Sequence, residues 1–131
     1  MGGEIDIMEA VAPDANQVHA AVHYSESQDW SPCGNSNHGP GNFSEVIPEG
    51  APKFNETFTT FGVEWDLDSL VFYWNETSYL TLPLPQEHFV QSKFYMILNL
   101  AVGGGWPGYP DNTTVFPQEH VIDWVRHYKR N

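Results

Sequence analysis

The stretch that decides the fold is short and acidic: Gly3-Glu4-Ile5-Asp6-Ile7-Met8-Glu9. Its carboxylates are interleaved with apolar side chains, a pattern typical of a β-strand. A strand turns residues i and i+2 to one face, so Glu4 and Asp6 point together. Strict alternation would send Glu9 to the opposite face. One extra residue near Met8, a β-bulge, would return Glu9 to the side of the other two acids.

Three acids on one face indicate chemistry, because like charges held together repel one another and a purely structural strand has no reason to accept that cost. Two carboxyls about 5–5.5 Å apart are the catalytic pair of a retaining glycosidase. The competing interpretation is a solvated acidic strand, since charged side chains usually face water.

The rest of the chain predicts an all-β fold. Ten prolines and eleven glycines interrupt it, and no long stretch has helical periodicity. The apolar run 94–101 predicts a buried strand, and residues 121–129 alternate, with Ile122, Trp124, Arg126 and Tyr128 on one face. Residues 4–10 and 18–24 are expected to pair as antiparallel strands, and residues 57–65 and 70–74 as a hairpin joined by Asp66 to Ser69. Further strands are expected at 94–101 and 121–129, and a long surface loop covers 25–53. Many short strands with such turns favour a β-sandwich.

Composition limits the partners. The 131 residues carry 17 acids against five Lys and Arg, for a net charge of −12. Such a charge repels nucleic acid but not a neutral polysaccharide. Aromatic residues make up 15% of the chain, with five tryptophans, which suits stacking on sugars and equally suits a β-rich core. No segment is long and apolar enough to span a membrane.

Four Asn-x-Ser/Thr sequons, at Asn42, Asn55, Asn75 and Asn112, favour a secretory-pathway origin. The first ten residues contain three acids and no basic region, so they do not form a signal peptide. Cys33 is the single cysteine and is either a free thiol or the partner of a cysteine outside this sequence.

Several motifs resemble glycoside hydrolase family 16, in its laminarinase branch. The bulged Glu-Ile-Asp-Ile-Met-Glu resembles that family's active-site signature, and His19 and His23-Tyr24 resemble the segment that follows it. Three further segments resemble later markers in the expected order: Phe58 to Trp65, Asn99 to Gly104 with Trp106-Pro107-Gly108, and Val121 to Tyr128.

The resemblance implies a concanavalin-like jelly roll and a parent protein that is secreted. Family-16 catalytic domains have about 230–250 residues, and their signature lies near the middle. Here it begins at residue 4. We therefore expect residues 1–131 to be the C-terminal portion of such a domain, a partial β-sandwich truncated at the N-terminus. A partial sandwich would leave apolar surface and strand edges open.

The resemblance also assigns catalytic roles. Glu4 would be the nucleophile and Glu9 the general acid and base, with Asp6 between them to orient Glu4 and supply negative charge. That charge is expected to raise the pKa of Glu9. His23 would bond to the carboxylates, or else be structural, and His19 is the weaker candidate of the two.

Further residues are expected to contact substrate. Trp65 and Trp106 are candidate sugar platforms, although Trp65 also suits a half-buried core position and Glu64 beside it is a weaker candidate. Asn99 reaches the cleft or caps a strand. No cofactor is expected. Asp123 matches a calcium ligand of many relatives, but no metal site is expected in this chain.

Three functions compete at this point. The first is retaining endo-hydrolysis of β-1,3-linked glucan by double displacement, with this stretch of chain inactive on its own. The second is non-catalytic β-glucan recognition, which the retention of Glu4, Asp6 and Glu9 disfavours. The third is a defunct fragment. The expected partner of the chain is a β-glucan polysaccharide, with no nucleic acid and no membrane span.

Overall fold

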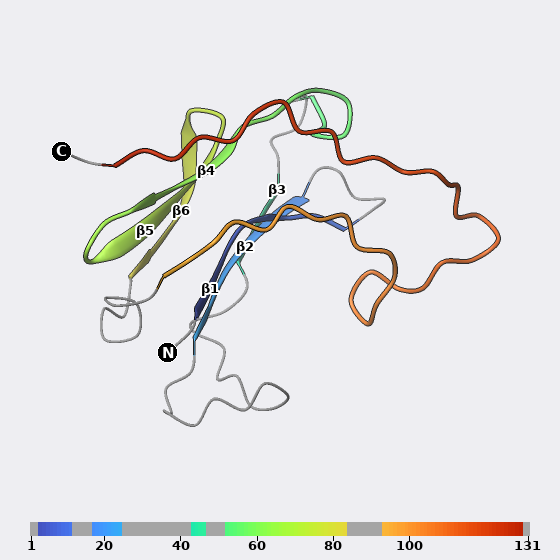
Figure 1. Ribbon diagram of the computed structural model, residues 1–131, viewed down its shortest axis with the longest axis horizontal. Coiled ribbons are helices and arrows are strands. Elements are labelled where there is room, and N and C mark those ends of the chain that lie inside the picture. The colour runs from blue at the N-terminus through green and yellow to red at the C-terminus, as the bar shows by residue number, and fades with distance from the viewer. Residues whose placement is uncertain (1–2, 12–16, 25–42, 47–51, 84–92, 130–131) are drawn as a thin grey trace. The chain divides into compact units, whose positions relative to one another are not determined.

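The computed structural model describes residues 3–11, 17–24, 43–46, 52–83 and 93–129 (Figure 1). The chain forms two compact units, Met1–Tyr95 and Met96–Asn131, and each is described by itself. All regular structure in the described residues is β-strand, as predicted. Cys33 and Asn42 lie outside the described residues.

The first sheet of unit 1 has three antiparallel strands in the order β1-β2-β3. They are β1 (Gly3–Glu9), β2 (Gln17–Tyr24) and β3 (Phe43–Val46). The pairing of β1 with β2 confirms the predicted hairpin. Strand β3 corrects the prediction that residues 25–53 are all loop, because its four residues pair with the start of β2.

The second sheet is an antiparallel meander in the order β4-β5-β6. Its strands are β4 (Phe61–Trp65), β5 (Ser69–Trp74) and β6 (Thr77–Pro83). The β4–β5 turn lies at Asp66 to Ser69 as predicted, and the Asp66 amide donates to the Ser69 carbonyl at 3.0 Å. Strand β4 begins at Phe61, so the start of the predicted 57–65 strand is wrong.

Asn75 fixes the turn between β5 and β6. Its φ of 52° is in the left-handed region, which Asn tolerates better than most residues. Its amide donates to the Thr60 carbonyl at 2.7 Å, and its side-chain Oδ1 accepts from the Thr60 amide at 3.1 Å. The turn therefore anchors the chain that leads into β4.

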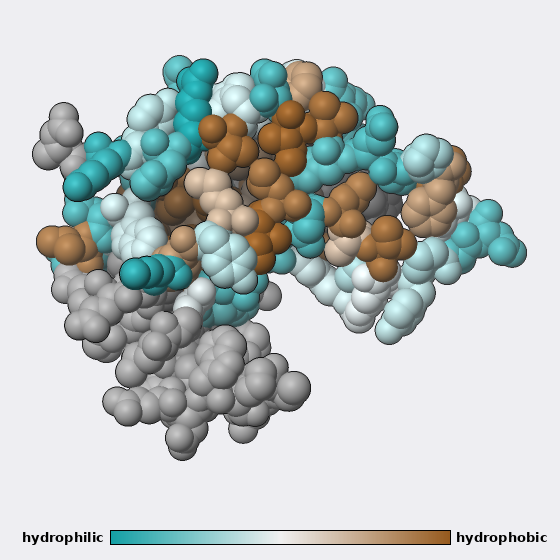
Figure 2. Space-filling model, in the orientation of Figure 1, coloured by the Kyte–Doolittle hydropathy of each residue, from teal (hydrophilic) through white to brown (hydrophobic). Residues whose placement is uncertain are grey.

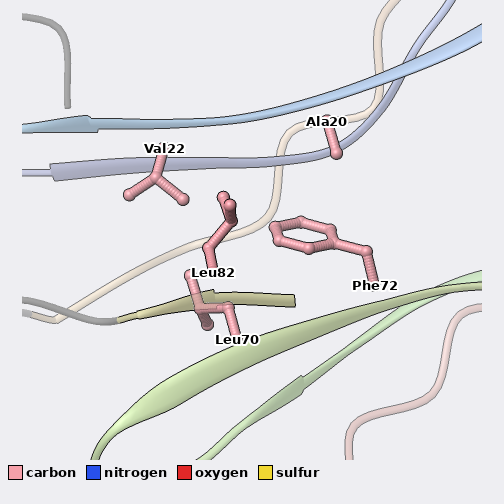
Figure 3. Close-up of a cluster of buried hydrophobic side chains, with 5 residues drawn as sticks. All are labelled: Ala20, Val22, Leu70, Phe72 and Leu82. Atoms are coloured by element: carbon pink, nitrogen blue, oxygen red, sulfur yellow. The ribbon is translucent and has the colours of Figure 1, made fainter. Parts of the chain in front are cut away.

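The core lies between the two sheets. Ala20 and Val22 of β2 face a cluster of buried side chains from the second sheet, Leu70, Phe72 and Leu82 (Figure 3). Ile5 of β1 packs against this cluster from the first sheet. Burying a side chain of this size contributes about 1.5–3 kcal/mol. Unit 1 is therefore an open sandwich, and the predicted all-β class is confirmed.

In its described residues, unit 2 forms no strand beyond an isolated bridge between Gly104 and Gly108. The predicted strands 94–101 and 121–129 are therefore wrong. Their apolar side chains are largely exposed, and Figure 2 shows hydrophobic residues on the visible surface of the molecule. The alternation in the second segment persists locally, because Arg126 Cζ lies 4.4 Å from the ring centroid of Trp124. The physical reason is pairing: an apolar segment becomes a buried strand only when another strand bonds to it.

No helix among the described residues is long and apolar enough to cross a membrane.

Candidate active site

Strand β1 separates apolar from acidic side chains across its two faces. Ile5 packs against the core, whereas its neighbour Glu4 is exposed and Asp6 is half-buried. This follows from the two-residue period of a strand whose one face covers a hydrophobic core. The acidic face of β1 is therefore the face turned away from the second sheet.

A β-bulge brings Glu9 to the same face as Glu4 and Asp6. Glu4 lies opposite His23 and Asp6 opposite Ala21, but Glu9 lies opposite His19. Two residues of β1 lie between Asp6 and Glu9, whereas a single residue of β2 lies between their partners. The register therefore shifts by one residue, as the spacing of the acids predicts.

The partner residues on β2 complete the site. His19, Ala21 and His23 are two residues apart along β2, so they share one face, and cross-strand partners face the same side. Val18, Ala20 and Val22 on the other face are buried. Two imidazoles therefore lie on the surface that carries the three carboxylates.

Asp6 is the electrostatic centre of this group. Its Oδ2 lies 3.1 Å from Nε2 of His23, and the two side chains are only 16% and 24% exposed. The pKa of Asp6 is raised to about 7, first by burial and then by the charges of Glu4 and Glu9 and by a hydrogen bond to Glu4. Near neutral pH the carboxyl of Asp6 is therefore partly protonated.

This arrangement is suited to acid–base and nucleophilic chemistry. Protonated Asp6 donates a hydrogen bond to the carboxylate of Glu4. A charged carboxylate beside a group that titrates near neutral pH is a common arrangement in catalytic sites. Among the described residues, no group of His, Cys, Asp and Glu side chains is arranged to hold a metal ion.

The structure places the predicted sugar contacts of unit 1 on the second sheet. Trp65 is half-exposed at the end of β4, with its ring edge-to-face against Phe94 at 5.0 Å between centroids. Glu64 is exposed and accepts a 2.9 Å hydrogen bond from the Tyr73 hydroxyl. No described contact joins Trp65 or Glu64 to the carboxylates of β1.

The other two predicted contacts belong to unit 2. Trp106 is 56% exposed at the tip of a tight turn, where the Gly104 amide donates to the Gly108 carbonyl at 2.9 Å. The positive φ angles of Gly103 and Gly108, 75° and 82°, suit glycine in such a turn. Asn99 is exposed in the extended segment before the turn. The roles of Trp106 and Asn99 stay predictions.

Sequence reasoning undervalued His19. It lies directly across from Glu9, in the position that His23 holds opposite Glu4. The four-residue spacing of the two histidines already places them on one face of a strand. The register of the hairpin, which decides which acid each histidine meets, is fixed only by the bulge.

The sequence matches the family model of glycosyl hydrolases family 16 over residues 1–126. The chain belongs to this family. Among curated family-16 relatives, it is 31% identical to the Beta-glucanase of Rhodothermus marinus over 97% of its own length, which is 44% of that protein. The chain thus spans less than half of this relative.

Two solved structures are similar in both fold and sequence to this family-16 chain. The endo-beta-1,3-glucanase of Pyrococcus furiosus gives a TM-score of 0.68 with 38% identity, covering 88% of this chain and 43% of that one. The laminarinase catalytic domain of Thermotoga maritima gives 0.65 with 36% identity, covering 87% of this chain and 45% of that one. In both comparisons, nearly nine tenths of this chain matches less than half of the solved chain.

Proposed function

We propose that this chain carries the catalytic strand of a retaining endo-hydrolase of β-1,3-linked glucan. The observation that supports it best is the bulge that turns Glu4, Asp6 and Glu9 to one face of β1 in a chain of family 16. The two solved relatives are a laminarinase and an endo-beta-1,3-glucanase, which favours a laminarin-like substrate.

In this proposal Glu4 attacks the anomeric carbon and forms a covalent glycosyl-enzyme, while Glu9 protonates the departing oxygen. Glu9 then takes a proton from the water that hydrolyses the intermediate. Asp6 holds Glu4 through their hydrogen bond, and His23, whose Nε2 lies 3.1 Å from Oδ2 of Asp6, holds Asp6 in turn. Asp6 therefore positions the nucleophile, and its titration adjusts the charge beside Glu4.

The first test is a change of Glu4 to Gln, which keeps the shape of the side chain and removes the nucleophile. Hydrolysis of laminarin by a protein that carries this chain should fall by at least about 10³-fold, while laminarin still binds. Glu76→Gln, at an exposed acid in the β5–β6 turn, is the matched control and should leave the rate unchanged. A Glu4 variant as active as the control would overturn the assignment.

The stereochemistry of the product tests the retaining mechanism separately. Proton NMR of the first products should show the β-anomer before mutarotation sets in, because two inversions restore the configuration. The α-anomer appearing first would show that water attacks directly. Binding of laminarin without any hydrolysis would favour the alternative, a non-catalytic glucan-recognition protein.

We also propose that a protein carrying this chain is secreted and glycosylated. Three of its sequon asparagines, Asn55, Asn75 and Asn112, are exposed in the described residues. Asn75 already uses its Oδ1 to accept from Thr60, so its occupancy should be the lowest of the three. Peptide mass spectrometry with and without glycosidase treatment, on protein from a eukaryotic secretory host, would measure each site.

A further inference from the structure

His23 and Asp6 belong to neighbouring strands of one hairpin, yet they are not direct cross-strand partners. Asp6 lies opposite Ala21, and His23 lies opposite Glu4. The imidazole of His23 nevertheless reaches Asp6, with 3.1 Å between Nε2 and Oδ2. Ala21 is fully buried and has only a methyl side chain, so it brings no polar group to meet the carboxyl. His23 therefore supplies the polar partner that Asp6 does not find directly across the hairpin.

Asp6 stands between His23 and Glu4. It forms a hydrogen bond with Glu4 and an ion-pair contact with His23. The side chains of Asp6 and His23 are only 16% and 24% exposed, so little water separates them from one another or screens their charges. A carboxyl and an imidazole at this distance can share one proton, which is held either by Asp6 or by His23.

The proton on Asp6 depends on the charge of Glu4. Burial is the largest cause of the raised pKa of Asp6, and the charge of Glu4, the charge of Glu9 and the hydrogen bond to Glu4 follow. Two of these causes need Glu4 as a carboxylate. A neutral Glu4 would no longer repel the ionised form of Asp6, and the hydrogen bond would lose its charged acceptor. Asp6 should therefore release its proton more readily whenever Glu4 is neutral.

We propose that His23 takes up the proton of Asp6 when Glu4 becomes neutral, and returns it when Glu4 regains its charge. This inference rests on the proposed function, in which Glu4 becomes neutral by forming an ester with the sugar. As the bond from Glu4 to the anomeric carbon forms, the bond to the leaving oxygen breaks and Glu9 gives its proton to that oxygen. Asp6 loses one proton in the same step, and Nε2 of His23 gains one.

The second half of the reaction reverses this transfer. Glu9 takes a proton from water, the water oxygen bonds to the anomeric carbon, and Glu4 leaves that carbon as a carboxylate. His23 then gives up its proton and Asp6 regains one. A negative carboxylate is therefore present beside the sugar in both halves, first Glu4 and then Asp6, which suits a transition state with positive charge on the ring. In this role His23 acts through Asp6 and is a positioning residue.

One other imidazole shares this face of the hairpin. His19 lies opposite Glu9, two residues further along β2 from Ala21. On β3, the titratable residue Glu45 is paired with Val18, which belongs to the core face of β2. His19 is therefore the natural internal comparison for the protonation of His23.

The test uses Glu4→Gln in the 131-residue chain, because this change makes the side chain neutral without any turnover. Nitrogen-15 NMR of the imidazole rings and carbon-13 NMR of the carboxyls report both protonation states at pH 7. The protonated fraction of Asp6 should fall by at least about twofold, and the protonated fraction of His23 should rise. The change at His19 should be smaller than the change at His23.

Two further variants grade the effect. Glu9→Gln removes one charge and leaves the hydrogen bond between Asp6 and Glu4, so it should move the proton in the same direction by a smaller amount. Glu76→Gln, at an exposed acid in the β5–β6 turn, should leave both protonated fractions unchanged. If Glu4→Gln does not fold, which loss of the cross-strand contact between Asp6 and Ala21 would reveal, Glu9→Gln decides alone.

Two results would overturn the inference. One is an Asp6 that keeps its proton in folded Glu4→Gln, or in Glu9→Gln where that variant decides. The other is an Asp6 that loses its proton while His23 gains none. These readouts need no glucan, so they are separate from the proposed activity. Undiminished laminarin hydrolysis by Glu4→Gln would overturn the proposed function and leave the measured proton transfer standing, whereas a fixed proton on Asp6 would overturn only this inference.

Discussion

Strand β5 and residues 96–102 are both rich in large apolar residues, yet their side chains differ in exposure. Leu70 and Phe72 of β5 are fully buried, whereas Leu98 and Leu100 are more than half exposed. The difference lies in the partners. Strand β5 has a neighbour on each side and β2 across the core. Apolar composition makes burial favourable, and the strands available to pair decide whether burial happens.

The largest expected difference is in the free energy of unfolding when one leucine is truncated to alanine, either in β5 or in residues 96–102. Leu70→Ala removes a fully buried side chain and should lower the free energy of unfolding by about 2–5 kcal/mol. Leu98→Ala should change it by less than about 0.5 kcal/mol. Urea denaturation followed by tryptophan fluorescence measures both. Comparable losses in the two variants would mean that Leu98 is packed in the isolated chain.

The pKa values of two acids, Asp6 in unit 1 and Asp111 in unit 2, are shifted in opposite directions. The pKa of Asp6 in unit 1 is raised to about 7, first by burial. The pKa of Asp111 in unit 2 is lowered, first by the hydrogen bond from the Thr113 hydroxyl, with further bonds from nearby backbone amides. A buried acid among like charges and an exposed acid surrounded by donors therefore titrate in opposite directions.

A smaller effect is expected in the pH dependence of the free energy of unfolding, because of the raised pKa of Asp6. The pKa of Asp6 is above its unfolded value of 3.8, so the folded state binds more protons between pH 4 and 7. Asp6 therefore lowers the stability as pH rises through that window, and the loss is complete above it. Asp6→Asn should raise the free energy of unfolding by about 1–2 kcal/mol at pH 8 and leave it nearly unchanged at pH 4.

The control for this measurement is Glu56→Gln, which removes one exposed acid elsewhere in unit 1. It should shift stability little, and by a similar amount at both pH values. If Asp6→Asn raised the free energy of unfolding equally at pH 4 and pH 8, the pKa of Asp6 would not be raised in the folded protein.

The smallest expected effect is a change in the pKa of Asp111. Thr113→Val removes the hydroxyl that donates to Asp111 at 2.7 Å. The pKa of Asp111 should then rise toward 3.8, because the largest cause of its lowering is gone. Carbon-13 NMR titration of the side-chain carboxyls measures this shift, and the titration of Asp6 in the same spectra should not move.

Much of unit 1 follows from its sequence because its signals are local. The acidic alternation and the odd spacing of Glu9 predict β1 and its bulge, and Asp66 predicts the β4–β5 turn. Strand β3 was missed because four residues of mixed polarity, in a region rich in Ser, Asn, Gly and Pro, carry no usable period. The strand at 94–101 was wrong because periodicity and propensity report a tendency, and pairing is not encoded within the segment.

The candidate site, like the fold of unit 1, could be predicted in part from the sequence. The three acids and His23 follow from the motif and the two-residue period of a strand. The position of His19 across from Glu9 needed the register, which the bulge shifts by one residue. The roles of Trp65, Asn99 and Trp106 depend on distances across the molecule, which no local pattern contains. They stay predictions, as do the catalytic roles of Glu4, Asp6 and Glu9.

The central claim is the bulge, because it alone brings Glu9 to the face that carries Glu4 and Asp6. Cross-strand nuclear Overhauser effects between backbone protons of β1 and β2 test it directly in isotopically labelled protein. The account predicts contacts from Asp6 to Ala21 and from Glu9 to His19. A contact from Glu9 to Val18 in place of His19 would mean an unbroken register, with Glu9 on the core face, and would contradict it.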